Sequence, residues 1–414
     1  MRGIIFAGLL CALGAPLFQA QTIPQDEYRE RRAKLRNSLD GTMVLFGRTV
    51  GQDEVFGFVQ ESNFYYLTGW TQPNAVLLLT RDQDILFLPH HDVRMETFTG
   101  KHPSAEDSDV KAVTGFDQVM SIEKLESQLT HAMETSEKVY TLPRQPGAEK
   151  LNAFLSLRET SDAQPLIAKL RVKKSPAEIA AIQHATDVSI EGHRATWKRL
   201  AAGLYEYQLS ATFTDAIFEA GCERYAYSPI VGSGPNSTVL HYSSNRRRMD
   251  RGEVVVMDAA AECNYYASDI TRTVPVGGRF SARERELYEI VLGAQKAALA
   301  ATKPGARMSG EGNTLNKIAR DYIDSHGKDL HGEKLGKYFT HGLGHPVGID
   351  VHDVNYPGPL EAGMVITLEP GIYIPEEGIG IRIEDVVLVT ENGARVLSAA
   401  LPKEPDEVEK ALAR

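Results

Sequence analysis

The stretch VVVMDAAAECNYYASDITRTVPV, residues 254–276, predicts two β-strands joined by a tight turn. With Cys263 and Asn264 as the central turn residues, Asp258 and Asp269 lie directly opposite each other, and their side chains share one face of the ribbon. Two like charges placed in this way repel each other and destabilise the strand pair. The pattern therefore indicates that a positively charged group lies between the two carboxylates.

A second hairpin repeats this arrangement in VITLEPGIYIPEEGIGIRIEDVVLV, residues 365–389. A turn centred on Glu376 and Glu377 places Glu369 opposite Glu384. One acidic residue at a strand end is more often a turn or cap residue than a ligand. Two carboxylate pairs in two apolar hairpins form a joint pattern, and this joint pattern favours a shared binding site.

Between and before the hairpins lie histidines that could complete such a site. The spacing of His341 and His345 in THGLGHPVGIDVHDV (residues 340–354) would suit a zinc-binding helix, but the glycines and the proline disfavour a helix. We expect an extended chain in which His341 and His345 share one face. Further candidates are His352, in the same segment, and His241, in NSTVLHYSSN.

Four carboxylates that converge with imidazoles form an oxygen-rich site for divalent cations, most naturally for two of them. Two dications neutralise four carboxylates, hold a bridging hydroxide and polarise a carbonyl group. Oxygen ligands with a single imidazole suit Mn²⁺, while Co²⁺ and Zn²⁺ remain alternatives because affinity alone rarely selects the metal. The residues themselves thus predict a hydrolase with two metal ions.

The length of 414 residues favours two domains. The formal net charge of −10 argues against nucleic acid or an anionic membrane surface as the main partner. Helix and strand signals alternate in the first half, which indicates an α/β domain, whereas long helices and hairpins in the second half indicate an α+β domain. Ser175 and Glu178 form a capping-box pattern that opens the first long helix. We predict an N-terminal domain at residues 21–170 and a catalytic domain at residues 171–414.

Residues 1–20 have the composition of a secretory signal peptide, with a positive end, an apolar run and Ala20 where cleavage fits. This predicts an exported protein, periplasmic or secreted, that has no membrane attachment after cleavage. Cys11 lies in this segment. The remaining cysteines, Cys222 and Cys263, could form one disulfide or stay two packed thiols, and the sequence leaves both open.

The motifs VGSGPNSTVLHY, SDITRTVPV, HGLGHPVGIDVHD, LEPGIYI and GIGIRIEDVVLVT resemble the metallopeptidase family that contains aminopeptidase P and prolidase. QESNFYYLTGW, residues 60–70, is similar to the N-terminal domain of the same family. The resemblance implies an α+β pita-bread C-terminal catalytic domain preceded by an α/β N-terminal domain. Relatives are often dimers or tetramers, so a homodimer or homotetramer is expected.

The resemblance also implies which residues bind the metals. Asp258 would bind one metal and Asp269 and Glu384 would bridge both, while His345 and Glu369 would hold the second. Glu369 would in addition take a proton from the attacking water. One departure from the family pattern is Pro346, which follows His345 where an aromatic residue or glycine is common.

Four further residues take roles from the resemblance. His341 would stabilise the tetrahedral intermediate or shuttle a proton. His241 and His352 would line the substrate pocket near the proline, and Arg382 would stand behind the ligands and tune their orientation. The implied activity is that of an Xaa-Pro aminopeptidase acting on proline-containing peptides. A prolidase that cleaves Xaa-Pro dipeptides is the nearest alternative, and a metal-free binding protein of the same fold is a more distant one.

Overall fold

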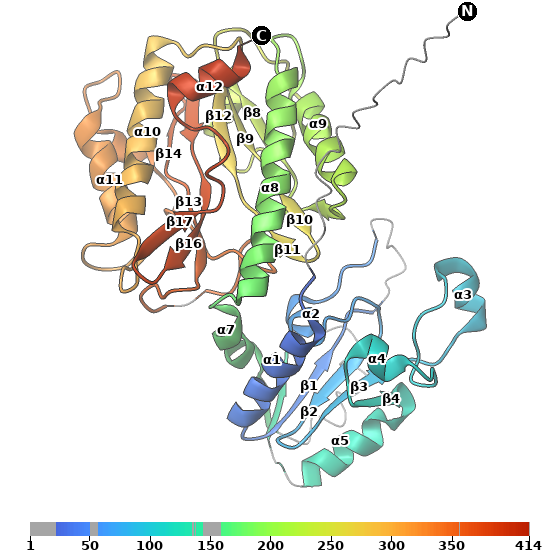
Figure 1. The fold of residues 1–414 in the computed structure, drawn as a ribbon. Helices are drawn as coiled ribbons and strands as arrows, with labels where there is room; N and C mark the ends of the chain where they lie inside the picture. Colours follow the sequence, from blue (N-terminus) through green and yellow to red (C-terminus); the bar gives the residue numbers. More distant parts are fainter. Residues whose placement is uncertain are drawn as a thin grey trace, which may run out of the picture.

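The computed structural model describes residues 22–49, 57–134, 136, 138–143, 159–355 and 357–413. The predicted signal peptide at residues 1–20 lies outside these residues. Figure 1 shows two bodies, the first formed by the blue and cyan part of the chain and the second by the green to red part. Among the described residues, no helix combines the length and the apolar character that crossing a membrane requires.

The first body is built on one mixed sheet of six strands. The strands are β1 (Thr42–Phe46), β2 (Val76–Leu79), β3 (Asp84–Leu88), β4 (Gln118–Ser121), β5 (Lys138–Thr141) and β6 (Glu159–Asp162), in the order β4-β3-β2-β1-β5-β6. The helices are α1 (Gln25–Ser38), α2 (Ser62–Thr68), α3 (Val93–Thr99), α4 (Val110–Thr114) and α5 (Leu125–Glu134). Because successive strand residues point to opposite faces, Met43 and Leu45 share a core with α1 and α2, whereas Val44 and Phe46 share one with α5.

The second body begins at a short connector after α7 (Gln164–Arg171), the helix in which the predicted boundary at residues 170 and 171 falls. The first long helix, α8 (Pro176–Arg199), starts where the capping box predicted. The Ser175 hydroxyl accepts the Glu178 N–H at 3.1 Å, and the Glu178 carboxylate accepts the Ser175 N–H at 3.0 Å. The other helices are α9 (Glu206–Glu219), α10 (Ala282–Ala301), α11 (Leu315–His326) and α12 (Pro405–Leu412).

Strands fill the centre of the second body, between α8 and α9 on one side and α10 and α11 on the other (Figure 1). One sheet has the order β12-β9-β8, a second β13-β16-β17 and a third β11-β10-β7, while β14 pairs with β15 alone. Their bounds are β7 (Arg224–Tyr225), β8 (Ile230–Ser233), β9 (Val254–Asp258), β10 (Ala261–Cys263), β11 (Tyr266–Ala267), β12 (Thr271–Pro275), β13 (Val365–Leu368), β14 (Gly371–Ile374), β15 (Ile379–Arg382), β16 (Asp385–Thr390) and β17 (Gly393–Val396). This is the predicted combination of an α/β body with an α+β body.

The register of the first hairpin differs from the prediction. Asp258 pairs with Thr271 rather than with Asp269, because the central turn residues are Asn264 and Tyr265. Both turn residues have positive φ, 50° and 68°, as a two-residue hairpin of the I′ type requires. Moving the turn by one residue shifts the strand register by two residues. Because side chains alternate between faces with a period of two, the Asp269 side chain stays on the same face as Asp258.

The second hairpin has the predicted register. Leu368 pairs with Asp385 and Gly371 pairs with Arg382, so Glu369 and Glu384 lie opposite each other between the two ladders. The two hairpins also touch, because the Glu384 N–H donates to the Thr271 carbonyl at 3.0 Å. The four acidic residues are thereby gathered around one point of the second body.

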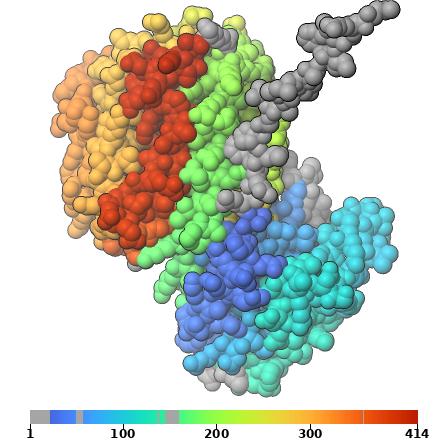
Figure 2. Space-filling model, viewed as in Figure 1, coloured from blue at the N-terminus to red at the C-terminus, as the bar shows by residue number. Residues whose placement is uncertain are grey.

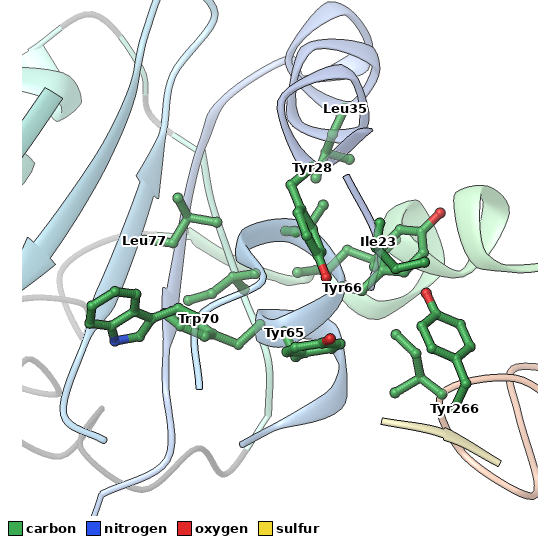
Figure 3. Close-up of a cluster of buried hydrophobic side chains, with 14 of the residues drawn as sticks. Ile23, Tyr28, Leu35, Tyr65, Tyr66, Trp70, Leu77 and Tyr266 are labelled. Carbon is green, nitrogen blue, oxygen red and sulfur yellow. The ribbon is translucent and has the colours of Figure 1, made fainter. Parts of the chain in front are cut away.

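The tip of the first hairpin reaches the first body. The rings of Tyr265 and Tyr65 stack with their centroids 3.9 Å apart, and Figure 3 shows Tyr266 beside the buried aromatic side chains of the first body. In Figure 2 the blue surface of the first body rests against the green surface of the second. Of the two alternatives for the cysteines, a disulfide or two thiols, the structure has the disulfide. Cys222 and Cys263 form it next to this tip.

Candidate active site

The predicted site residues surround one cavity of about 550 Å³ in the second body. Its wall combines carboxylates and imidazoles with a few apolar side chains, among them Leu240 and Val351. All of the residues singled out from the sequence line this cavity: Asp258, Asp269, His345, Glu369, Glu384, His241, His341, His352 and Arg382. The structure therefore brings together the whole predicted set.

One group of ligand atoms is especially close. The ligand atoms of Asp269, His345 and Glu384 lie within 4.8 Å of one another. His345 Nε2 lies 3.3 Å from Asp269 Oδ2 and 3.5 Å from Glu369 Oε1, while its Nδ1 faces the Pro346 carbonyl at 3.1 Å. An imidazole held in this way through Nδ1 presents Nε2 to a metal.

His345 is also held by the strand beside it. Its backbone N–H donates to the Thr367 hydroxyl at 3.0 Å, and the same hydroxyl donates to Glu369 at 3.3 Å. The segment from His341 to His345 is not helical, as expected from its glycines. Leu343, between the two histidines, packs into the hydrophobic core instead of facing the cavity.

Tyr227 is a site residue that the sequence did not reveal. Its hydroxyl donates to Asp269 Oδ1 at 2.6 Å and also contacts Asp258 Oδ1. Burial, followed by the charges of Asp258 and Asp269, raises the pKa of Tyr227 well above its ordinary value. The phenol therefore stays protonated and links the two aspartates of the first hairpin.

Three carboxylates of the cavity, Asp269, Glu369 and Glu384, have raised pKa values. Burial, followed by the charges of Asp269 and Glu369, raises the pKa of Glu384. Burial also raises the pKa of Asp269 and of Glu369, although His345 partly opposes this in both cases. For His345, burial alone would lower the pKa, but Asp269 and Glu369 outweigh it and raise the pKa to about 9. The raised pKa values show that these acids do not readily ionise side by side. A pair of divalent cations would supply the positive charge that lets them ionise together, so the site fits such a pair.

Arg382 contributes a resident positive charge beside Asp258. Its guanidinium donates to Asp258 Oδ2 at 2.7 Å, to the Thr271 hydroxyl at 3.2 Å and to the Tyr373 hydroxyl at 3.0 Å. Tyr373 is a second residue that the sequence did not reveal. Because its oxygen accepts from Arg382, its single proton is free to go to His341 Nε2, 2.9 Å away.

The three remaining histidines differ in their surroundings. Burial, followed by the charge of Arg382, lowers the pKa of His341 to about 4, so this imidazole is neutral at pH 7. Its Nδ1 lies 2.8 Å from the Gly342 carbonyl. His241 and His352 are exposed at the mouth of the cavity, and the His352 ring lies 4.0 Å from that of His345. Both are accessible to a molecule that enters.

Metal binding is expected to release protons. The raised pKa values of Glu369, Glu384 and His345 mean that the metal-free site carries protons at neutral pH, and a metal must displace them. The apparent affinity for a divalent cation should therefore rise with pH up to about 9, the pKa of His345. Titration calorimetry of the metal-free protein in two buffers of different ionisation enthalpy measures the protons released. Equal heats in both buffers would contradict this expectation.

Comparison with known proteins places the chain in a family. Residues 180–391 match the model of metallopeptidase family M24, and residues 28–140 match the model of the aminopeptidase P N-terminal domain. The protein belongs to metallopeptidase family M24 and carries an aminopeptidase P N-terminal domain ahead of its catalytic domain. The resemblance read from the sequence motifs is thereby confirmed.

Within that family the chain is similar to Xaa-Pro aminopeptidases over nearly its whole length. It is 34% identical to the Xaa-Pro aminopeptidase of Haemophilus influenzae, over 94% of this chain and 97% of the relative. It is 34% identical to the Xaa-Pro dipeptidase of Pyrococcus furiosus, over 89% of this chain and 98% of the relative. The solved structure of Escherichia coli aminopeptidase P with the inhibitor Pro-Leu superposes with a TM-score of 0.84 at 28% identity, covering 94% of this chain and 98% of the other. These neighbours also confirm the pita-bread fold class.

Proposed function

We propose that this protein is a metal-dependent Xaa-Pro aminopeptidase that cleaves the peptide bond between an N-terminal residue and a following proline. The observation that carries the proposal is the convergence of Asp258, Asp269, His345, Glu369 and Glu384 in one accessible cavity. A chain of the same fold that had lost its metals would be expected to lack some of these side chains. The similarity to Xaa-Pro aminopeptidases over 94% of this chain supports the choice of substrate.

The metal ligands proposed are those inferred from the sequence. Asp258 would hold one ion, His345 and Glu369 the other, and Asp269 and Glu384 both. When bound, a pair of divalent cations supplies an activated water molecule and a Lewis acid for the scissile carbonyl. Four carboxylates with a single imidazole favour Mn²⁺, which we propose as the metal, and two ions balance the four negative charges.

The chain's own residues would orient the substrate and move the proton. Glu369 would accept the proton of the attacking water, a role that its raised pKa suits. His241 and His352 at the cavity mouth would contact the peptide near its proline. His341 would stabilise the tetrahedral intermediate or shuttle a proton, and either role requires it to exchange Tyr373 or the Gly342 carbonyl for the substrate.

We further propose that the protein is exported, to the periplasm or outside the cell. The support is the signal-peptide composition of residues 1–20. The Cys222–Cys263 disulfide is in keeping with an oxidising compartment. A homodimer or homotetramer remains the proposal for the oligomeric state.

Turnover of matched peptides tests the proposed activity. With Mn²⁺ added to chelator-treated protein, an Xaa-Pro-Yaa tripeptide is expected to lose its first residue, and an Xaa-Ala-Yaa control is expected to remain intact. The corresponding Xaa-Pro dipeptide addresses the alternative, an Xaa-Pro dipeptidase, which the 34% identity to the Pyrococcus furiosus enzyme favours as the second candidate. Hydrolysis confined to the dipeptide would reject the aminopeptidase proposal. Chromatography of the reaction products measures how much of the N-terminal residue each peptide has released.

A further inference from the structure

The loop from His345 to Asp353 connects a metal ligand to the cavity mouth. Its first residues pair with β13, where the His345 carbonyl accepts the Thr367 N–H at 2.8 Å and the Val347 N–H donates to the Val365 carbonyl at 3.0 Å. The Gly348 carbonyl accepts the Ala267 N–H at 2.9 Å, and the loop closes where the Asp353 N–H donates to the Pro346 carbonyl at 3.0 Å. His352 lies near the end of this loop with an exposed side chain. The position of its ring therefore depends on the backbone that carries it.

The two aspartates that flank His352 bind the same guanidinium. Arg171, the last residue of α7, donates through one terminal nitrogen to Asp350 Oδ2 at 2.6 Å and contacts Asp353 Oδ1 with the same nitrogen. The side chains of Arg171 and Asp353 are each 2% exposed. Lys174, in the connector after α7, donates to Asp353 Oδ2 at 2.8 Å.

The loop is shaped around this buried carboxylate. A Cβ at Gly348 would lie 2.2 Å from Asp353 Oδ2 and 3.0 Å from Lys174 Cε, so only glycine leaves room for the ion pair. Burial by itself would raise the pKa of Asp353, but Lys174 and Arg171 outweigh it and hold the pKa below its ordinary value. The carboxylate is therefore ionised, and removing Arg171 would leave this buried charge with Lys174 as its one remaining cation.

The other end of this contact lies in the first body. The second terminal nitrogen of Arg171 donates to Asn63 Oδ1 at 2.7 Å, and the Ser62 hydroxyl donates to Asp350 Oδ1 at 2.5 Å. Both residues open α2, whose first turn is capped by Glu61 through the Phe64 N–H at 2.7 Å. The motif QESNFYYLTGW contains none of the candidate metal-binding residues. Ser62 and Asn63 nevertheless join it to the loop that carries His352.

We infer that Arg171 is a positioning residue for the reaction: by binding Asp350 and Asp353 it fixes His352 at the cavity mouth, and by binding Asn63 it ties that position to the N-terminal domain. The planar guanidinium reaches three acceptors at once, which a lysine ammonium on a flexible stem would not reproduce with the same geometry. The inference rests on the proposed function, because it takes its catalytic meaning from the substrate contact assigned to His352.

Hydrogen exchange tests the structural half of the inference without any substrate. In Arg171→Met, amide exchange of residues 347–353 is expected to be faster than in the wild-type protein. Arg31→Met is the matched control, because Arg31 is equally buried at the junction, bound to the Tyr66 carbonyl at 3.0 Å and 3.3 Å from Glu178. Arg31→Met should leave exchange of the loop unchanged. Equal exchange in the loop of both variants would overturn the inference.

A double-mutant cycle tests the catalytic half. Arg171→Met is expected to lower kcat/KM for an Xaa-Pro-Yaa peptide by about ten-fold or more, mainly through KM, and by less than about three-fold when His352→Ala is already present. A purely structural arginine would cost the same factor in both backgrounds, and that result would overturn the inference. Metal content is expected to stay at the wild-type level.

These measurements distinguish failure of the proposed function from failure of the inference about Arg171. A wild-type protein that does not hydrolyse Xaa-Pro peptides would reject the proposed function, while the exchange result would still decide whether Arg171 holds the loop. If Arg171→Met does not fold, Asp350→Asn serves in both experiments, since the Asp350 side chain is 45% exposed and its loss is milder. An Asp350→Asn variant with unchanged loop exchange and unchanged KM would contradict the inference in that case.

Discussion

Asp269→Asn is expected to lower kcat/KM by roughly 10³-fold or more, about 4 kcal/mol of transition-state stabilisation, and to reduce the metal content of the protein. Asp269 is the carboxylate nearest to His345 Nε2, at 3.3 Å, and it also accepts from Tyr227 at 2.6 Å. Asparagine has nearly the same shape but lacks the negative charge that two cations would share. Elemental analysis of the purified variant and steady-state kinetics measure the two effects.

Asp187→Asn is the matched control for this substitution. Asp187 lies on α8, outside the cavity, and accepts a hydrogen bond from Gln183 at 2.9 Å. The same chemical change is expected there to leave both turnover and metal content at the wild-type level. Full turnover in Asp269→Asn would show that the assignment of a bridging role to this residue is wrong.

Chelation of the metal is expected to abolish turnover and to lower the melting temperature by about 5 °C. A ligand present at about 1,000 times its Kd stabilises the folded state by about 4 kcal/mol, and a chain of this length has an unfolding entropy of about 0.9 kcal/mol per kelvin. Without cations, Asp269, Glu369 and Glu384 lie buried beside one another with raised pKa values. Differential scanning fluorimetry after verified metal removal measures the change, and re-addition of Mn²⁺ should reverse it. An unchanged melting curve would contradict the coupling.

The sign of the pH dependence follows from the same groups. An acid whose pKa is raised in the folded state stabilises that state at low pH, and the stabilisation is lost as the pH rises through the raised pKa. The metal-free protein therefore loses stability at these three residues between acidic and neutral pH, whereas the loaded protein has cations to compensate. The difference in melting temperature between the two forms should widen from pH 5 to pH 8.

The convergence of the four carboxylates and His345 on one cavity could be predicted from the sequence, because these residues form a pattern of order and spacing along two hairpins. The register of the second hairpin was also predictable, since its turn lies at the midpoint between Glu369 and Glu384. The register of the first was not, because Tyr265 adopts a positive φ of 68°, which is uncommon for tyrosine. Its ring stacks on that of Tyr65, which lies 200 residues earlier in the sequence. A pattern of neighbouring residues cannot predict such a distant contact.

Two of the residues that sequence reasoning missed act across long separations. Tyr227 meets Asp258 and Asp269 at separations of 31 and 42 residues, and Arg171 meets Asp353 at a separation of 182. Tyrosine and arginine are common near the start of a strand or the end of a helix. Their residue type therefore does not indicate a role in the site. The domain limits at residues 21–170 and 171–414, the signal peptide, the native metal and the oligomeric state stay predictions.

The stacked pair of Tyr65 and Tyr265, together with the contacts of Arg171 and Ser62 with Asp350, fastens the two halves of the molecule at separate points. A hinge between the halves would have to break an aromatic stack and a buried guanidinium contact in every cycle. The consequence is that the cavity is already formed before a substrate arrives, and its shape does not depend on one half closing over the other.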